Sequence, residues 1–347
     1  ASGLDEMLGS PSVTGGRVYF QTRYATYCLG KAGAATKDVI PATGVEGGEG
    51  EKPGKALMIP GEITLAPGES VKFDLARFTT FGRASADAIP EPEWTLAGAV
   101  GVWDPKSRTF TAGQDAKFSA GVLKAKIGDG EATARIRVSP KLPIKVDFED
   151  LKPDATPPGW QNVISKTKII EQDGGKVLQK LAERPSPPFM RIRAYMTPPI
   201  AGGYTITADM MSNSRKTPIK EFWADMGVIN SRYELRIMGN EPKATYVRLV
   251  AWDSIPRVQK DVPFAWQPGA WYRAKFEVRY DGGKALLRGK VWPRDAKEPD
   301  AWLIEETDPY PNLEGSPGLY AYSNGTTEKS KGAEVFFDNV TVTDNAK

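Results

Sequence analysis

The clearest pattern along the chain is the alternation of hydrophobic and polar positions from residue 144 to residue 347. A period of two is typical of β-strands, because successive side chains point to opposite faces of a sheet. Asp281-Gly282-Gly283 favours a tight hairpin turn, and helical periodicity is almost missing. The pattern predicts strands at residues 203–211, 221–229, 231–238, 244–252, 271–280, 283–292, 316–322 and 333–343. Antiparallel strands in this number predict a two-sheet sandwich.

A second stretch, residues 59–140, alternates over shorter strands such as Glu62–Leu65 and Ala132–Val138. Turn signals recur about every ten residues, which is typical of a small immunoglobulin-like sandwich. Trp94 is expected in the core of that sandwich. The residues between the two segments, 140–143, read Pro-Lys-Leu-Pro and predict a short, stiff linker.

The first stretch, residues 1–58, contains one strand pair and then a Gly-rich linker or long loop over residues 30–54. The runs GGRVYFQ at 15–21 and YCLG at 27–30 resemble the closing strands of a PQQ-type β-propeller repeat. This resemblance implies that the chain is the C-terminal part of a larger protein with a propeller upstream. The alternative is a hairpin that docks on the next domain.

Two further resemblances concern the later segments. LAPGE at 65–69, FTA at 110–112 and ARIRV at 134–138 look like a bacterial immunoglobulin-like domain, usually a spacer. The third segment resembles the concanavalin A-like lectin and glucanase fold through the following runs: 146–150, 271–278, 287–292, 298–302 and 335–342. That fold hosts lectins, adhesion modules, hydrolases and plain spacers, so it does not specify a function.

The predicted fold is therefore all-β: a propeller-like strand pair at 1–58, an immunoglobulin-like sandwich at 59–140 and a jelly-roll at 144–347. No stretch reaches about eighteen uninterrupted apolar residues, so no membrane span is predicted. The formal net charge is only +3 and the chain has no polybasic block, which argues against nucleic-acid binding. We expect an exported protein of the periplasm or cell surface.

Composition excludes several kinds of chemistry. The chain has no histidine, which rules out Ser-His-Asp and Cys-His catalysis and histidine-ligated zinc. The only cysteine, Cys28, cannot form an intramolecular disulfide or a CxxC site, and its apolar surroundings predict a buried thiol. Nothing resembles a phosphate loop or a dinucleotide fingerprint, so no organic cofactor is predicted.

No catalytic residue is predicted either. Retaining glycosidases of the concanavalin A-like fold use a Glu-x-Asp-x-x-Glu strand motif, and the two partial matches fail. Glu298-Pro299-Asp300 is followed by Leu303, and Glu306-Thr307-Asp308 by Pro311. Two carboxylates from different strands could still lie about 5 to 10 Å apart, so a hydrolase using only Asp and Glu stays open.

A structural calcium ion is a further candidate. Glu149 and Asp150 open the jelly-roll segment, and Asp338 and Asn339 lie near its end. The first and last strands of sandwiches are commonly neighbours, which would bring these oxygen-bearing side chains together. Calcium prefers such flexible oxygen ligands. The alternative is that these residues are solvated or belong to turns.

Aromatic and charged residues share strand faces in several predicted strands. Carbohydrate sites pair flat aromatic rings with such polar side chains, whereas a solvated sheet face would show similar charges with fewer tryptophans. Trp271 and Trp302 are expected in the core. The predicted ligand residues are Trp223, Asp225, Arg232, Glu234, Arg236, Tyr246, Arg248, Trp252, Arg288, Lys290 and Trp292.

The functional prediction is non-catalytic binding of a polysaccharide or glycan by the jelly-roll. A glycan-processing hydrolase is the first alternative. The second is a scaffold that contacts an envelope protein, as the propeller resemblance to outer-membrane assembly factors of the BamB type implies. A groove containing Trp223, Trp252 and Trp292 would favour sugar, and a broad flat apolar patch would favour a protein partner.

Overall fold

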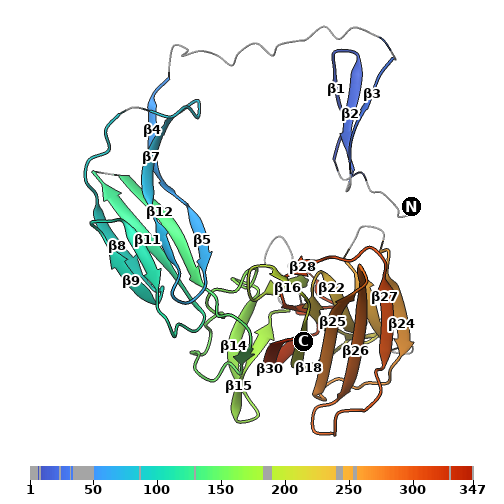
Figure 1. Cartoon of the computed structure of the whole chain (residues 1–347). Coiled ribbons are helices and arrows are strands. Elements are labelled where there is room, and N and C mark those ends of the chain that lie inside the picture. Colours follow the sequence, from blue (N-terminus) through green and yellow to red (C-terminus); the bar gives the residue numbers. More distant parts are fainter. Residues whose placement is uncertain are drawn as a thin grey trace. The chain divides into compact units, whose positions relative to one another are not determined.

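The structure is a computed structural model, and it describes residues 7, 9–22, 25–31, 33, 51–85, 87–128, 130–182, 190–239, 245–252, 256–327 and 330–345 (Figure 1). The chain divides into two compact units, Ala1–Lys55 with Arg77–Asp87, and Ala56–Ala76 with Ala88–Lys347. Every regular element in the described ranges is a β-strand, which confirms the predicted all-β class. The described residues contain no helix that could span a membrane.

The smaller unit contains an antiparallel sheet of β1 (Ser12–Thr14), β2 (Arg17–Gln21) and β3 (Thr26–Leu29). Gly15 and Gly16 make the first turn with positive φ angles, which glycine adopts without steric cost. The rings of Phe20 and Tyr27 stack across β2 and β3 with centroids 4.9 Å apart. Cys28 is exposed, so the prediction of a buried thiol was wrong: both faces of this sheet are open to solvent over β3. The propeller resemblance stays a prediction.

The next strands form small sheets with the orders β6-β10-β9, β5-β12-β11-β8 and β4-β7. Phe73, Phe110, Leu123 and Ile136 are fully buried between them. Trp94 packs against this core, 5.1 Å from the ring of Trp103, as predicted. The strands are β4 (Pro53–Ile59), β5 (Glu62–Leu65), β6 (Ser70–Lys72), β7 (Asp74–Thr79), β8 (Glu93–Ala97), β9 (Gly101–Asp104), β10 (Thr109–Ala112), β11 (Ser119–Ile127) and β12 (Gly130–Val138).

The remaining strands build the predicted two-sheet sandwich. An eight-stranded sheet has the order β14-β15-β30-β18-β25-β26-β27, with β13 also paired to β30, and a six-stranded sheet has the order β16-β29-β21-β22-β23-β24. The strands of the larger sheet are β13 (Ile144–Val146), β14 (Thr167–Gln172), β15 (Gly175–Lys180), β18 (Tyr204–Ser212), β25 (Tyr272–Asp281), β26 (Lys284–Pro293), β27 (Ile304–Asp308) and β30 (Val335–Asp344).

The strands of the six-stranded sheet are β16 (Arg191–Tyr195), β21 (Asp225–Asn230), β22 (Tyr233–Met238), β23 (Tyr246–Ala251), β24 (Gln259–Pro263) and β29 (Gly318–Tyr322). Two short pairs accompany the sandwich: β17 (Ile200–Ala201) with β28 (Glu314–Gly315), and β19 (Ser214–Lys216) with β20 (Glu221–Trp223). The predicted hairpin at Asp281–Lys284 is present, with Gly282 and Gly283 at positive φ.

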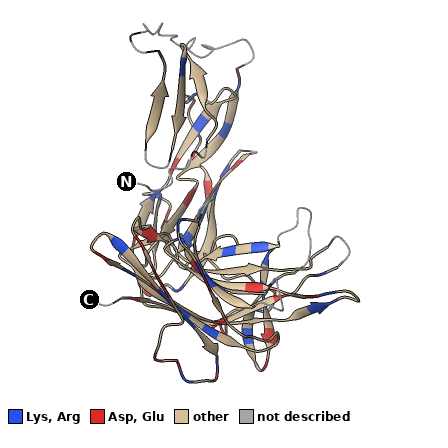
Figure 2. Ribbon diagram, turned by 90° about the vertical axis from the view of Figure 1, so that its right-hand side faces the viewer, with Lys and Arg blue, Asp and Glu red and all other residues tan. Residues whose placement is uncertain are grey.

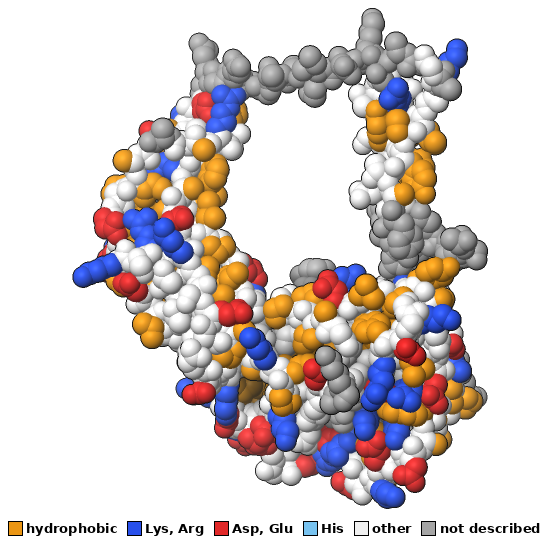
Figure 3. Space-filling view, in the orientation of Figure 1, with side chains coloured by type: hydrophobic (Ala, Val, Ile, Leu, Met, Phe, Trp, Pro, Cys, Tyr) orange, Lys and Arg blue, Asp and Glu red, His pale blue; other side chains and the backbone are white. Residues whose placement is uncertain are grey.

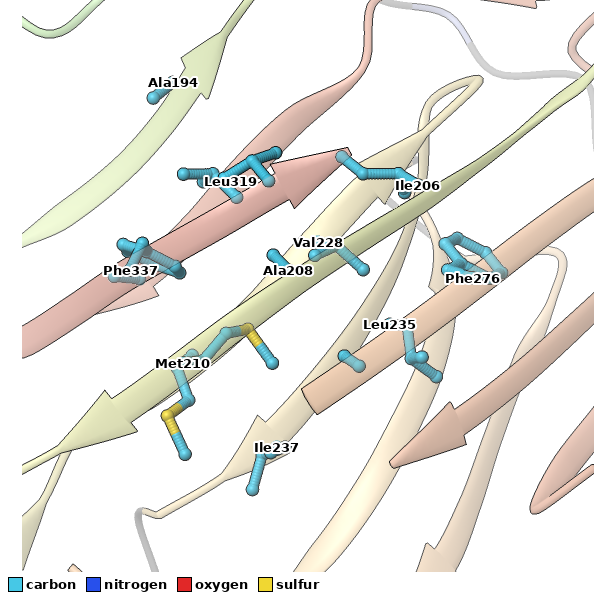
Figure 4. Close-up of a cluster of buried hydrophobic side chains, with 14 of the residues drawn as sticks. Ala194, Ile206, Ala208, Met210, Val228, Leu235, Ile237, Phe276, Leu319 and Phe337 are labelled. Atoms are coloured by element: carbon cyan, nitrogen blue, oxygen red, sulfur yellow. The ribbon is translucent and has the colours of Figure 1, made fainter. Parts of the chain in front are cut away.

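The core lies between the two sheets (Figure 4). Val228, Leu235 and Leu319 of the six-stranded sheet face Ile206, Ala208, Met210 and Phe276 of the eight-stranded sheet, and all are buried. Because strand side chains alternate, the neighbours of these residues point to the outer faces. Lys, Arg, Asp and Glu recur along the strands in Figure 2, and Figure 3 shows basic and acidic side chains interspersed over the sandwich.

Candidate ligand-binding face

The strand register decides which side chains meet on the outside of the six-stranded sheet. Val228 lies opposite Leu235, and both point into the core. The alternate positions Gly227, Arg236 and Arg248 follow one another across β21, β22 and β23. These positions therefore point outward, and three neighbouring strands contribute to one surface.

A buried carboxylate lies at the middle of this surface. The side chain of Glu234 is 0% exposed, and its two oxygens accept hydrogen bonds from the Nε atoms of Arg193 and Arg236, each at 2.5 Å. Both arginine side chains are 15% exposed. A carboxylate removed from water is stable only when its oxygens are satisfied, and two guanidinium groups meet that need here.

Aromatic rings support the two guanidinium groups. The guanidinium carbon of Arg236 lies 4.2 Å from the ring centroid of Tyr320. That of Arg193 lies 5.7 Å from Tyr320 and 4.7 Å from Trp252. Tyr320 is buried, which raises the pKa of its phenol, whereas Trp252 is 51% exposed. Trp252 thus offers solvent one flat side of a ring whose orientation is supported by Arg193.

Two further arginine–aromatic pairs flank this centre. Arg248 forms two 2.7 Å hydrogen bonds to Asp261, which raise the pKa of its guanidinium group, and it lies 5.2 Å from the ring of Tyr246. On the other side, exposed Arg191 lies 5.4 Å from the ring of Tyr322, its partner in the β16–β29 register. We call the whole set the arginine–aromatic face: Arg191, Arg193, Glu234, Arg236, Tyr246, Arg248, Trp252, Asp261, Tyr320 and Tyr322.

Five of the residues singled out from the sequence lie on this face: Glu234, Arg236, Tyr246, Arg248 and Trp252. Asp225 also points outward, opposite Tyr322, but it is buried. Its carboxylate accepts a 2.8 Å hydrogen bond from the backbone N–H of Gly239. Asp225 therefore links Gly239, the residue after β22, to β21.

Two other predicted ligand residues are placed differently. Trp223 belongs to the core, where its ring meets that of Trp266 edge to face at 5.0 Å. The predicted strand 221–229 is interrupted at Ala224, so the period-two phase that placed Trp223 beside Asp225 does not hold. Arg232 is not on a strand: with Ser231 it forms the β21–β22 turn at positive φ, and its side chain is exposed.

Arg288, Lys290 and Trp292 lie on the other sheet, along the outer side of β26. There the chain covers them. Arg288 and Lys290 lie 4.9 and 4.8 Å from the ring of Trp302, and Lys290 donates hydrogen bonds to Glu298 and to the carbonyl of Pro299. Trp302 therefore lies over this outer side, and its predicted position in the core was wrong. Trp292 is only 5% exposed. The three predicted tryptophans therefore do not share a groove.

The four residues predicted to bind calcium are engaged in several different contacts. Glu149 accepts a 2.8 Å hydrogen bond from the backbone N–H of Lys176, and Asp150 pairs with Lys117. Asn339 donates hydrogen bonds to Asp338 and to Asp209. Among the described residues, no three His, Cys, Asp or Glu side chains are grouped so that they could hold a metal ion. Calcium stays a prediction.

Burial changes the acidity of one of these groups. Burial raises the pKa of Asp338 to about 6, and the neighbouring Asp209 and Glu149 act in the same direction. Asp209 itself is 0% exposed and bound by Arg273 through hydrogen bonds of 2.6 and 2.8 Å. This carboxylate pair lies on the outer side of the eight-stranded sheet, opposite the arginine–aromatic face.

The sequence patterns missed half of the arginine–aromatic face: Arg191, Arg193, Asp261, Tyr320 and Tyr322. No strand was predicted at β16 or β24, and Tyr320 was within a predicted strand but was not considered as a ligand. One signal was available: RIRAY at 191–195 alternates basic and apolar residues as strictly as the strands that were recognised.

Neither a protein-family model nor a curated protein matches the sequence. Among solved structures, the crystal structure of basic winged bean lectin with Tn-antigen is 9% identical over 58% of this chain and 97% of the lectin, with a TM-score of 0.37. A structure described by "endo-acting O-glycanases to initiate mucin breakdown" is 11% identical over 58% of this chain and 98% of its own, with a TM-score of 0.38. A bifunctional GH43-CE protein of Bacteroides eggerthii is 12% identical over 97% of this chain and 40% of its own, with a TM-score of 0.40. At such values these likenesses carry no argument about function.

Proposed function

We propose that the C-terminal sandwich binds a polysaccharide or glycan on the arginine–aromatic face, without cleaving it. The observation that carries the proposal is the half-exposed ring of Trp252, held beside a buried arginine–carboxylate network on an outer sheet face. Aromatic rings offer a flat apolar side, and guanidinium and carboxylate groups bond hydroxyls in fixed directions. Sugars present both kinds of surface.

The geometry of Glu234 supports binding over cleavage. A glycosidase needs one carboxylic acid that donates a proton to the leaving group and a second carboxylate beside it. Both oxygens of Glu234 already accept hydrogen bonds from arginines, and both oxygens of Asp261 accept hydrogen bonds from the Nε and Nη2 atoms of Arg248. These two carboxylates are arranged to orient guanidinium groups.

The proposal extends to the setting of the protein. A glycan-binding module of this kind acts outside the cytoplasm, at the cell surface or in the periplasm, and the immunoglobulin-like segment is a spacer. The scaffold alternative requires a broad apolar surface for a protein partner. On the arginine–aromatic face the exposed part is largely polar, with Trp252 as its most exposed aromatic ring.

The test is a glycan array with the whole chain and two variants. Trp252→Ala removes the exposed ring. Trp302→Ala is the control because Trp302 also contacts arginine but lies between β26 and β27, over the other sheet. We expect saturable binding that weakens about tenfold or more in Trp252→Ala and persists in Trp302→Ala. Silence from folded protein across the array would contradict glycan binding. Release of shortened sugar would contradict the absence of cleavage.

A further inference from the structure

We infer that the ligand of the arginine–aromatic face is an acidic polysaccharide whose sugar rings carry carboxylate groups. This rests on the proposed function and names the class of glycan. The inference comes from the charges on the face and from how each of them is paired. The outward-pointing charged residues are the cations Arg191, Arg193, Arg236 and Arg248 and the anions Asp225, Glu234 and Asp261.

The positive excess is concentrated at one end of the face. At the β23–β24 end, Arg248 and Asp261 form a closed pair with two hydrogen bonds. At the centre, two guanidinium groups share the single negative charge of Glu234. At the β16–β29 end, Arg191 contributes another positive charge. The half of the face formed by β16, β29, β21 and β22 therefore contains three arginines and two carboxylates, Glu234 and the buried Asp225, so one positive charge is in excess.

Arg191 is the cation best placed to meet a ligand. Its side chain is exposed, and among the described residues no carboxylate lies within ion-pair distance of it. One side of its guanidinium group is covered by the ring of Tyr322 at 5.4 Å, so its N–H edge is left for a partner. A guanidinium edge matches a carboxylate with two parallel hydrogen bonds.

The stacking rings also fix the positions of these charges. Arg191 and Arg193 are two residues apart on β16, about 7 Å along the strand, and both point outward. Arg193 contacts Trp252, so the exposed ring and Arg191 both lie close to Arg193 on the same face. A short acidic oligosaccharide could stack on Trp252 while its carboxylate binds Arg191. Little side-chain freedom is lost on binding, since the rings already hold the guanidinium groups.

The experiment compares polysaccharides that differ only in charge. Affinity electrophoresis of the whole chain uses polygalacturonate and its fully methyl-esterified form, and alginate and hyaluronan each with its carboxyl-reduced form. We expect at least one acidic polymer to bind about tenfold or more tightly than its neutral partner, and the difference to shrink as salt is raised. Arg191→Gln should reduce binding of the acidic polymer about tenfold and leave the melting temperature unchanged.

Arg279→Gln is the matched control, because Arg279 is an arginine that is 48% exposed on the eight-stranded sheet. It should bind like the parent. Equal binding within every polymer pair would contradict the inference that the ligand is an acidic polysaccharide. Loss of binding in Arg279→Gln as large as in Arg191→Gln would contradict it as well. Glycan binding itself would survive that result. If only neutral glycans bind on the array, the acidic class is also wrong, and if nothing binds, the proposed function fails.

Discussion

On the outside of the six-stranded sheet, solvent reaches one of the aromatic rings that the guanidinium groups contact. On the outside of the eight-stranded sheet, the connection between β26 and β27 covers the basic side chains. Arg193 rests on Trp252, which is 51% exposed. Lys290 is bound by Glu298 and covered by Trp302, and its side chain is 8% exposed. The same residue types therefore form the proposed binding surface in one place and stabilise the fold in the other. What differs is whether the chain itself covers them.

The largest expected effect concerns two tryptophans that both point outward. Trp292→Ala on the covered face should lower the free energy of unfolding by about 3–5 kcal/mol, because it removes a buried ring and leaves a cavity. Trp252→Ala should change it by less than about 1 kcal/mol, because half of that ring is already in water. Urea unfolding measures both. Equal losses of stability in the two variants would contradict the conclusion that one face is covered and the other is open to solvent.

The next effect concerns the two buried carboxylates. Glu234→Ala and Asp209→Ala should each lower the free energy of unfolding by about 2–3 kcal/mol, because each leaves arginines without their partner. Only Glu234→Ala should also weaken glycan binding, since Asp209 lies on the other sheet. Binding measured below the unfolding transition separates the two effects. Loss of binding in Asp209→Ala would place the ligand elsewhere.

Asp338 should make stability depend on pH. Its folded pKa of about 6 exceeds the ordinary value of 3.8, so the folded state binds the proton more tightly. Its contribution is fully present below pH 3.8 and is lost as pH rises through about 6. Asp338→Asn should therefore gain up to about 1–2 kcal/mol over the parent at pH 7, after allowance for solvent screening, and the gain should vanish by pH 4.

The same variant tests the calcium prediction. If Asp338 and Glu149 bind calcium, adding the ion at pH 7 should raise the melting temperature of the parent, and Asp338→Asn should remove that rise. Thermal unfolding with calcium and with EDTA measures it. An unchanged melting temperature in the parent would contradict the prediction that calcium binds at this edge of the sandwich.

The smallest effect concerns Tyr322. Tyr322→Leu removes the ring beside Arg191 and should cost less than about 1 kcal/mol of stability, as expected for an exposed cation–π contact. Binding of an acidic polymer should weaken about threefold, because Arg191 then has to be ordered by the ligand. Titration calorimetry measures this. Binding as tight as in the parent would mean that Tyr322 does not position Arg191.

Period-two patterns predicted the sandwich and which residues of one strand share a face. Glu234 and Arg236 were placed together correctly because β22 is regular from Tyr233 to Met238. The same rule failed at Ala224 and at the Ser231-Arg232 turn, where the strand is interrupted and the phase is lost. Such interruptions depend on tertiary contacts, such as the packing of Trp223 on Trp266.

Which strands share a sheet could not be predicted from local patterns. β26 looked as suitable for a ligand face as β22, yet β26 pairs with β25 and β27 in the other sheet. Arg193 reaches Glu234 only because β16 and β29 join the same sheet from opposite ends of the segment. Pairing between distant segments depends on the packing of the whole core. It therefore leaves no periodic pattern in the sequence of either strand.

β30 lies inside the eight-stranded sheet, with β13 and β15 on one side and β18 on the other. Ile144 thus pairs with Val342, so the two ends of the sandwich meet only after nearly all of it has been synthesised. Such distant pairing slows folding. On the ribosome, a nascent chain that lacks β30 exposes unpaired edges on three strands, and such edges invite association with other chains. Premature termination before residue 335 should therefore yield aggregates rather than a smaller folded module.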